Sequence, residues 1–306
     1  MAITAPLTSG AESNHSGSAR RPAARVSVPA FLGLVPFAAY VLLFLALPTL
    51  LAVLSGFFTE DGTFTLDNLA ALADPVILRA FANSIGLSLL TAVVGAVVGA
   101  LACYAMLGLA EDGRVRGIVD GASGVLAQFG GVMLAFAFIA TIGVQGLVTV
   151  WLRDTFGIDI FVNGAWIYDL PGLVLPYIYF QVPLMVITFM PAMAALRPQW
   201  AEANLTLGGS TGGFWLRIGI PVLAPSFAAS LLLLFANAFS SYATAAALAS
   251  QGSQIVPLQI RAALVSETVL GRENLAGTLA LGMVVIMAIV MWGYSIIQRR
   301  AARWQR

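Results

Sequence analysis

The sequence has few charged residues, no lysine, and a single residue each of histidine and cysteine. Charged residues make up 9% of its 306 residues and hydrophobic residues 59%, whereas a soluble globular domain has about 25% charged residues. The chain is therefore predicted to be an integral membrane protein. All 15 basic residues are arginine, so it cannot form the phosphate-binding loop that needs a lysine after its glycines. The chain is not an ATPase by itself.

The scarcity of histidine and cysteine excludes further kinds of site. His15 and Cys103 are the only residues of their types, which excludes a metal centre built from His and Cys ligands and a disulfide within the chain. Cys103 lies in an apolar run, where we expect a buried thiol that packs as a small hydrophobic side chain. We expect no cofactor in this chain and no nucleic-acid partner.

Six apolar runs are long enough to cross a bilayer, whose core needs about 20 helical residues. They lie at 31–57, 82–109, 122–151, 172–194, 222–249 and 275–298. The expected fold is all-α, an integral membrane domain of six transmembrane helices at 31–299. Residues 1–30 are rich in Ala, Ser, Pro and Arg and have no apolar period, which predicts a disordered tail. Residues 300–306 are expected to form a short basic tail.

The distribution of arginine predicts the orientation of these helices. Eleven arginines lie in the two tails and in the loops at 110–121 and 195–221, and four lie in the loops of the other face. Because basic loops stay in the cytoplasm, both termini and the 195–221 loop are expected there. No Asp, Glu, Arg or His lies within the six runs, which disfavours transport driven by protons or by the membrane voltage.

Neutral polar residues remain within the runs. Asn237, Ser241 and Thr244 are spaced at i, i+4 and i+7 in the fifth run, so on one continuous helix they would form a stripe. Ser240 lies beside them. A stripe favours the lining of a translocation path, whereas interhelical packing is the ordinary role of a single polar residue such as Gln181 in the fourth run. We interpret these five residues as candidates for the path.

The 195–221 loop contains local signals for two short helices. Pro198 suits the first turn of a helix that reaches about residue 207, with Glu202 near the positive end of its dipole. Gly208 can provide a left-handed helix end. Ser210 or Thr211 can cap a second helix.

The second helix of the loop is expected to end at Pro221, where the next span begins. It carries Phe214 and Trp215, two large aromatic residues on a short exposed helix. We expect them either to lie in the lipid interface or to enter a groove on another protein.

The loop resembles the signature loop of the permease subunits of binding-protein-dependent ABC importers. That signature is Glu-Ala-Ala, three residues, Gly, nine residues, Ile-x-Leu-Pro. The matching positions are Glu202, Ala203, Gly208, Ile218 and Pro221. Asn204 replaces the second Ala and Ile220 replaces Leu. The resemblance covers about 31–306 and implies the fold of a type I importer permease.

The resemblance implies a transporter subunit of the bacterial cytoplasmic membrane that is not an enzyme. The loop would dock in a cleft of a separate ATP-binding subunit, which binds the ATP. Gly208 would set the angle of the loop, Glu202 would hold it by a polar contact, and Phe214 and Trp215 would fill the cleft. The other implied partners are a second permease subunit, as a heterodimer in preference to a homodimer, and an extracytoplasmic solute-binding protein.

The transported solute is the least constrained part of the resemblance. The permeases for spermidine and putrescine are most similar, and those for iron, thiamine and phosphonates are near. Polyamine permeases often carry an acid in the fifth span, and this sequence has none there. A polyamine-like solute is the expectation.

Two other classes remain open. A passive channel or a structural membrane subunit, with the loop flat on the lipid, would act without ATP and would not co-purify with an ATPase. An integral membrane enzyme ranks lower because no cluster of titratable residues falls at membrane depth.

Overall fold

A computed structural model describes residues 28–59, 62–110, 113–249, 255–265 and 273–304. The chain divides into two compact units, one that ends at Thr49 and one that begins at Leu50. All regular structure in the described residues is helical, apart from one isolated bridge between Phe58 and Phe64. The tail expected at 1–30 lies outside the described residues except for its last three, which begin the first helix.

The first unit contains α1 (Val28–Val41) and a π-helical turn, η1 (Leu42–Ala46), and leads into α2 (Leu47–Ser55). The Leu47 N–H donates to the carbonyl of Leu42, five residues back. Pro48 follows directly, and a proline has no N–H and crowds the carbonyl four residues before it. The wider π turn accommodates that crowding without ending the helix.

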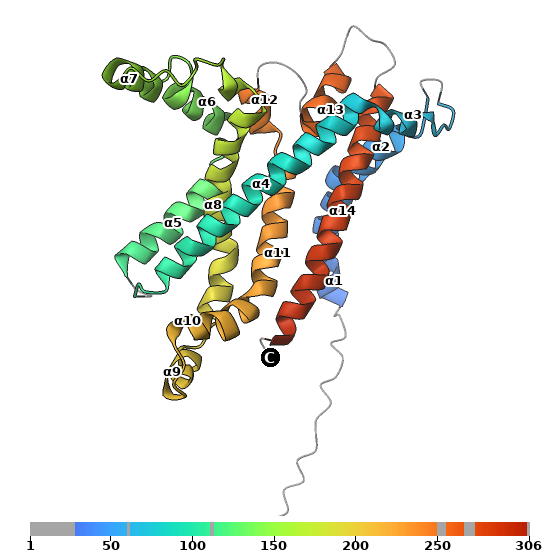
Figure 1. Cartoon of the computed structure of the whole chain (residues 1–306). Helices are drawn as coiled ribbons and strands as arrows, with labels where there is room; N and C mark the ends of the chain where they lie inside the picture. Colours follow the sequence, from blue (N-terminus) through green and yellow to red (C-terminus); the bar gives the residue numbers. More distant parts are fainter. Residues whose placement is uncertain (1–27, 60–61, 111–112, 250–254, 266–272, 305–306) are drawn as a thin grey trace, which may run out of the picture. The chain divides into compact units, whose positions relative to one another are not determined.

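The second unit, Leu50 onward, holds the remaining helices (Figure 1). They are α3 (Asp67–Ala70), η2 (Ala71–Ala73), α4 (Pro75–Met106), α5 (Arg114–Gln128), α6 (Gly131–Ile142), α7 (Leu147–Phe156), η3 (Trp166–Tyr168), η4 (Leu170–Leu173), α8 (Val174–Ala194), α9 (Pro198–Thr206), α10 (Thr211–Phe214), η5 (Trp215–Gly219), α11 (Ile220–Phe239), α12 (Ala243–Leu248), α13 (Val256–Val265) and α14 (Glu273–Trp304). Within this unit, α9 and α10 lie at one end and α12 and α13 at the other. We call the first the loop end.

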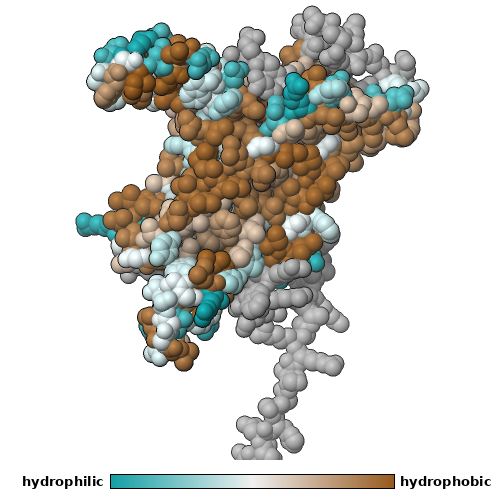
Figure 2. Space-filling view, in the orientation of Figure 1, coloured by the Kyte–Doolittle hydropathy of each residue, from teal (hydrophilic) through white to brown (hydrophobic). Residues whose placement is uncertain are grey.

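Six helical segments of the described chain are long and apolar enough to cross a membrane, which confirms the predicted number. They are Leu34–Ser55, Pro75–Met106, Gly131–Phe156, Leu170–Ala194, Thr211–Phe239 and Leu275–Arg299. Hydrophobic residues cover the middle of the face in Figure 2, and hydrophilic residues gather toward its ends. The last helix continues to Trp304 and so includes the first residues of the basic segment expected at 300–306.

The third predicted span, 122–151, is not one helix. It divides into α5, α6 and α7, with breaks at Phe129–Gly130 and at residues 143–146. A helix of 12 residues rises about 18 Å, short of a bilayer core of about 30 Å, so α6 alone does not span. The N–H of Gly131 donates to Thr244 Oγ1 at 2.9 Å. Thr244 of α12 is thus the acceptor for the Gly131 N–H, which has no partner within its own helix at the start of α6.

The fifth predicted span, 222–249, also divides. Helix α11 ends at Phe239, and α12 begins at Ala243 after a turn. In the turn, the hydroxyl of Tyr177 on α8 donates to the Ser241 carbonyl at 2.7 Å. That bond replaces a helical partner of the carbonyl, so the helix can end within an apolar run.

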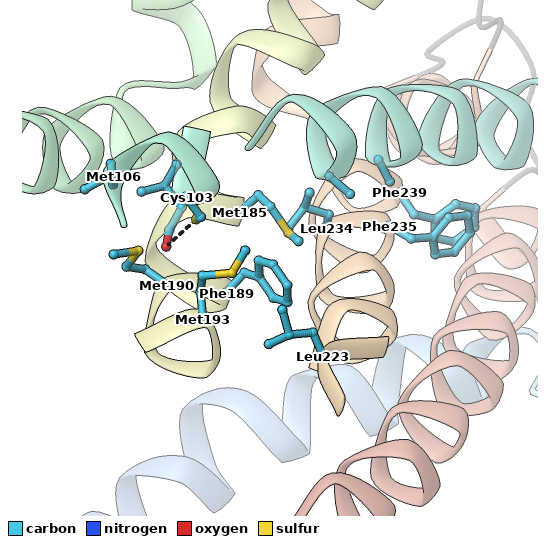
Figure 3. Close-up of a cluster of buried hydrophobic side chains, with 13 residues drawn as sticks. Cys103, Met106, Met185, Phe189, Met190, Met193, Leu223, Leu234, Phe235 and Phe239 are labelled. Carbon is cyan, nitrogen blue, oxygen red and sulfur yellow. Dashed lines mark hydrogen bonds between the residues drawn. The ribbon is translucent and has the colours of Figure 1, made fainter. Parts of the chain in front are cut away.

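Side chains of α4, α8 and α11 form the main core of the second unit (Figure 3). Met185 and Phe189 of α8 point toward Leu234 and Leu223 of α11. Cys103 of α4 is fully buried and its thiol contacts the Val186 carbonyl at 3.8 Å. The expected buried state of Cys103 is confirmed.

Two glycines bring α4 close to α8. A Cβ added at Gly95 would lie 2.5 Å from the Cβ of Gln181, and one added at Gly99 would lie 2.5 Å from the Cβ of Met185. Their spacing of four residues puts both on one face of the helix. Small residues with this spacing allow two membrane helices to approach closely.

Candidate functional site

The 195–221 loop folds as two short helices at the loop end of the second unit (Figure 1). Helix α9 runs from Pro198 to Thr206, and Gly208 has a left-handed φ of 78°. The Ser210 hydroxyl then accepts a hydrogen bond from the Gly213 N–H at 3.1 Å and caps α10. The predicted first helix, its glycine end and the cap at Ser210 are confirmed.

The second helix of the loop was expected to end at Pro221, but it does not. Helix α10 passes through the π turn η5 into α11 without a break, and the Ile220 N–H donates to the carbonyl of Trp215. Pro221 comes directly after Ile220. In the first unit, Pro48 likewise comes directly after Leu47, whose N–H also donates to a carbonyl five residues back. The wide turn again relieves the crowding that a proline imposes four residues back.

Asn204, the departure from the family signature, has a definite structural role. Its side-chain amide donates to the Ser210 carbonyl at 3.0 Å, across the bend between α9 and α10. Its own carbonyl accepts the Gly209 N–H at 2.8 Å. Alanine could make only the backbone bond, so Asn204 adds a second link that fixes the bend. The sequence marked the position as unusual but did not predict this link.

The two aromatic residues of the loop lie against the chain itself. Phe214 is buried, with 7% of its surface exposed, and Trp215 is half-buried. The Trp215 ring stands edge-on to Tyr104 of α4, with centroids 5.2 Å apart. The expectation that both side chains lie in lipid or on another protein is wrong for Phe214. Leu205 and Leu207, on either side of the end of α9, are exposed at 57% and 87%, and Leu216, further along the loop, is exposed at 72%.

The other signature residues fall on both sides of the bend. Glu202, Ala203 and Gly208 are exposed, Ile218 is half-buried and Pro221 is exposed. Glu202 lies beyond the first turn of α9, so the predicted contact with the helix dipole is wrong. Its carboxylate has no hydrogen bond or ion pair within the described residues. The structure thus leaves Glu202 free for a contact outside the part of the chain that it describes.

The polar stripe predicted on the fifth run does not exist, because Ser241 follows the end of α11 and Thr244 belongs to α12. Thr244 is fully buried and accepts the Gly131 N–H. Asn237 and Ser240 are exposed, and the Ser240 hydroxyl donates to a carbonyl of its own helix at 3.0 Å. The break that Thr244 and Tyr177 stabilise separates residues that the sequence placed on one helix.

Gln181 is an interhelical link in this structure. It is fully buried, and its amide nitrogen donates to the Leu234 carbonyl of α11 at 2.8 Å. Its side-chain oxygen has no partner in the described part of the chain. Interhelical packing is the ordinary role of a single polar residue in a span, and Gln181 follows it.

A cavity of about 1160 Å³ lies in the second unit, between α8, α9, α11 and α14. We call it the loop-end cavity. The polar and aromatic side chains that line it include Arg197, Trp200, Ser226, Ser230, Tyr294 and Arg299. None of the five predicted path residues lines it. In the described residues, no group of three or more His, Cys, Asp and Glu side chains could hold a metal ion.

Comparison with known proteins relates the chain to transporter subunits. No protein-family model matches. The chain is 26% identical over 241 residues to the trehalose transport system permease protein SugB of Mycobacterium tuberculosis, covering 78% of this chain and 79% of that protein. It is 26% identical over 223 residues to the spermidine/putrescine transport system permease protein PotB of Salmonella typhimurium, covering 68% and 74%.

A solved structure with the same fold is a chain of a bacterial alginate ABC transporter, in complex with an alginate pentasaccharide-bound periplasmic protein. The TM-score is 0.65 at 17% identity, and the match covers 88% of this chain and 93% of that chain. This likeness shows the fold, and the names of the sequence relatives agree with the family that the 195–221 loop resembles. The homologues of this multi-pass membrane protein are permease subunits of ABC importers, and the chain has their fold.

Proposed function

We propose that the chain is a membrane-spanning permease subunit of an ATP-driven importer in the bacterial cytoplasmic membrane. The observation that carries the proposal is the 195–221 loop, two short helices bent at Gly208 at one end of the second unit. In this proposal a separate ATP-binding subunit binds the ATP and receives the loop. A second permease subunit, different from this chain, completes the path, and an extracytoplasmic binding protein delivers the solute.

Exposed leucines provide the chemistry for docking. Leu205 and Leu207 are largely exposed beside the bend, and exposed apolar groups that lie together mark protein interfaces. We assign to them the cleft-filling role that was expected of Phe214 and Trp215. Glu202 supplies a polar contact beside them. These contacts must differ between the two states of the ATP-binding subunit, since equal contacts would shift no equilibrium.

Purification of the assembled transporter tests the docking. Leu207→Glu adds a charge where the proposal buries an apolar side chain, so the ATP-binding subunit should be lost from the purified complex. The matched control is Val162→Glu, an apolar residue of similar exposure, 76%, that lies between α7 and η3. It should retain the ATP-binding subunit. Retention by both variants would show that Leu207 does not dock, and solute flux without ATP would support a passive channel.

The bend itself gives a second test. Gly208 has a left-handed φ, where a side chain costs about 1–2 kcal/mol, while Gly212 has no positive φ and no atom within 4 Å of an added Cβ. Gly208→Val should therefore lower the binding-protein-stimulated ATPase activity of the assembled transporter several-fold. Gly212→Val should leave most of it. Equal activities in the two variants would contradict the role of the bend.

The identity of the solute is the finer part of the proposal. The relatives are named for trehalose and for spermidine and putrescine, and the structural neighbour for alginate. These names cover neutral, cationic and anionic solutes, so they favour none of these classes. The polyamine expectation stays a prediction, and the charges of the loop-end cavity bear on it.

A further inference from the structure

The loop-end cavity extends deep into the membrane-spanning part of α11. Its wall on this helix runs from Val222 to Leu233, a rise of about 16 Å, roughly half of a bilayer core. Arg197, at the start of α9, and Arg299, near the end of α14, are exposed at its shallow part, while Ser230 is buried. The cavity therefore has the form expected of a funnel that is open at the loop end and closed at mid-depth.

The charges on the wall of this cavity are of one sign. Arg197 and Arg299 are the charged residues that line it, and no carboxylate of the described chain does so. Neither arginine has an ion pair or a hydrogen bond from its side chain within the described residues. A cleft lined by one sign of charge concentrates ions of the opposite sign. The guanidinium group also matches the geometry of carboxylate and phosphate oxygens.

The deeper wall of the cavity is polar on one side. Ser226 and Ser230 are one helical turn apart on α11, and neither hydroxyl has a hydrogen bond within the described residues. Ser240, at the end of the same helix, bonds instead to the carbonyl of Ala236 at 3.0 Å. A hydroxyl without a partner at membrane depth is costly unless water or a polar ligand binds it. The two serines thus favour a water-filled cavity over one filled by acyl chains.

We propose that the loop-end cavity is the exit part of the translocation path and accepts a small solute that carries an anionic group, such as a carboxylate, phosphate or phosphonate. Arg197 and Arg299 bind the anionic group, and Ser226 and Ser230 bind its polar body. The inference rests on the proposed function as a permease. A polyamine would meet two arginines and no carboxylate in this cavity, so the charges oppose the solute class expected from the sequence.

Thiol labelling tests both the water and the charge, with the transporter as a full complex. The single cysteine, Cys103, is buried, so Cys103→Ala together with Ser226→Cys or Ser230→Cys places one reactive thiol of this chain in the cavity. Cysteine-free variants of the partner subunits are used, and the complex is reconstituted in nanodiscs of phosphatidylcholine. The probes are two methanethiosulfonates of similar size, the anionic ethylsulfonate and the cationic ethyltrimethylammonium reagent. Ala224→Cys, exposed on α11 outside the cavity lining, is the control.

The expected result is a preference for the anionic probe. Relative to a free thiol and in a buffer of low ionic strength, labelling at Ser226→Cys should favour the anionic reagent about tenfold, as two weakly screened charges within some 10 Å would produce. Arg197→Gln with Arg299→Gln should abolish this preference, and Ala224→Cys should show no dependence on the arginines. Faster reaction of the cationic probe, or a preference that survives the two arginine substitutions, would overturn the proposal. Ser230→Cys provides the same reading if Ser226→Cys does not fold.

Two further measurements complete the test. The first distinguishes a solute site from a lipid site, and the second distinguishes failure of the cavity proposal from failure of the proposed function. An inner-leaflet phospholipid headgroup has the same anionic chemistry, so the labelling is repeated in nanodiscs that contain phosphatidylglycerol. Loss of labelling that requires both arginines would identify a lipid site and overturn the solute assignment, whereas unchanged labelling supports it. ATP hydrolysis with the binding protein is measured on the same samples. Intact stimulation with a failed charge preference would reject the cavity proposal while the proposed function stands.

Discussion

Two glycines of α4 should respond in opposite directions to the same substitution. A Cβ at Gly95 would lie 2.5 Å from the Cβ of Gln181, while one at Gly86, on the same helix, would meet no atom within 4 Å. Carbon atoms in good contact are about 3.5–4.0 Å apart, so Gly95→Ala forces α4 and α8 apart by about 1 Å. Overpacking of this kind costs about 1–3 kcal/mol. Gly86→Ala should instead stabilise by about 0.4–1 kcal/mol, because it restricts the unfolded chain.

Thermal unfolding of the purified full-length chain in detergent measures both effects. For soluble proteins of 150–250 residues, 1 kcal/mol shifts Tm by about 2–4 °C, so Gly95→Ala should lower Tm by several degrees and Gly86→Ala should leave it equal or higher. A combined Gly95→Ala and Gln181→Ala variant should not recover the wild-type Tm, since the bond from Gln181 to Leu234 is also lost. A Gly95→Ala variant as stable as Gly86→Ala would refute the close α4–α8 contact.

Substitutions at three further residues probe the hydrogen bonds at the helix termini. Tyr177→Phe removes the donor to the half-buried Ser241 carbonyl and should destabilise the chain by about 1–3 kcal/mol in the same unfolding assay. Thr244→Val leaves the Gly131 N–H without its acceptor and should cost a similar amount, whereas Thr244→Ser, which keeps the hydroxyl, should recover most of it. Ser210→Ala removes the cap of α10 and should cost about 0.5–2 kcal/mol, seen as faster proteolysis of the loop with little change in global Tm.

Local signals in the sequence predict much of the fold. The number of spans follows from apolar length alone, since about 20 residues are needed to cross the bilayer. Helix α9 follows from Pro198 and its glycine end, and the cap at Ser210 follows from the residue type. Each of these signals acts within a few residues of the feature that it predicts, so no tertiary contact is needed to interpret it.

The breaks in the third and fifth runs depend on contacts between distant residues. Both runs are largely apolar, and their local signals, Gly130–Gly131 and Gly143–Gly146 in the third run and Ser240–Ser241 in the fifth, permit a helix to stop but do not require it. The bonds that satisfy the broken ends join Gly131 to Thr244 and Tyr177 to Ser241. These partners are more than 60 residues apart, so a pattern of period 3.6 carries no information about them.

The same limit explains the two aromatic residues of the 195–221 loop. A large aromatic side chain on a short helix needs an apolar neighbour, and the sequence alone offers lipid, a partner or the chain itself. The structure supplies Tyr104, from the end of α4, which stands edge-on to Trp215. Phe214 is buried beside it. Leu205 and Leu207, which have no sequence signature, are exposed and so remain available for an external contact.

The arginines of the loop-end cavity also contribute to the charge bias that predicts the orientation of the chain. Orientation depends on the sum over short loops rather than on any one residue. Replacing Arg197 and Arg299 leaves nine arginines on the expected cytoplasmic side against four on the other, so the variant should insert with the same orientation. Ion binding in the cavity depends instead on the two arginines that line it, because a charge more than a Debye length away, about 8 Å in physiological salt, is largely screened. Their replacement therefore separates the two roles: the labelling preference should disappear while the orientation is kept.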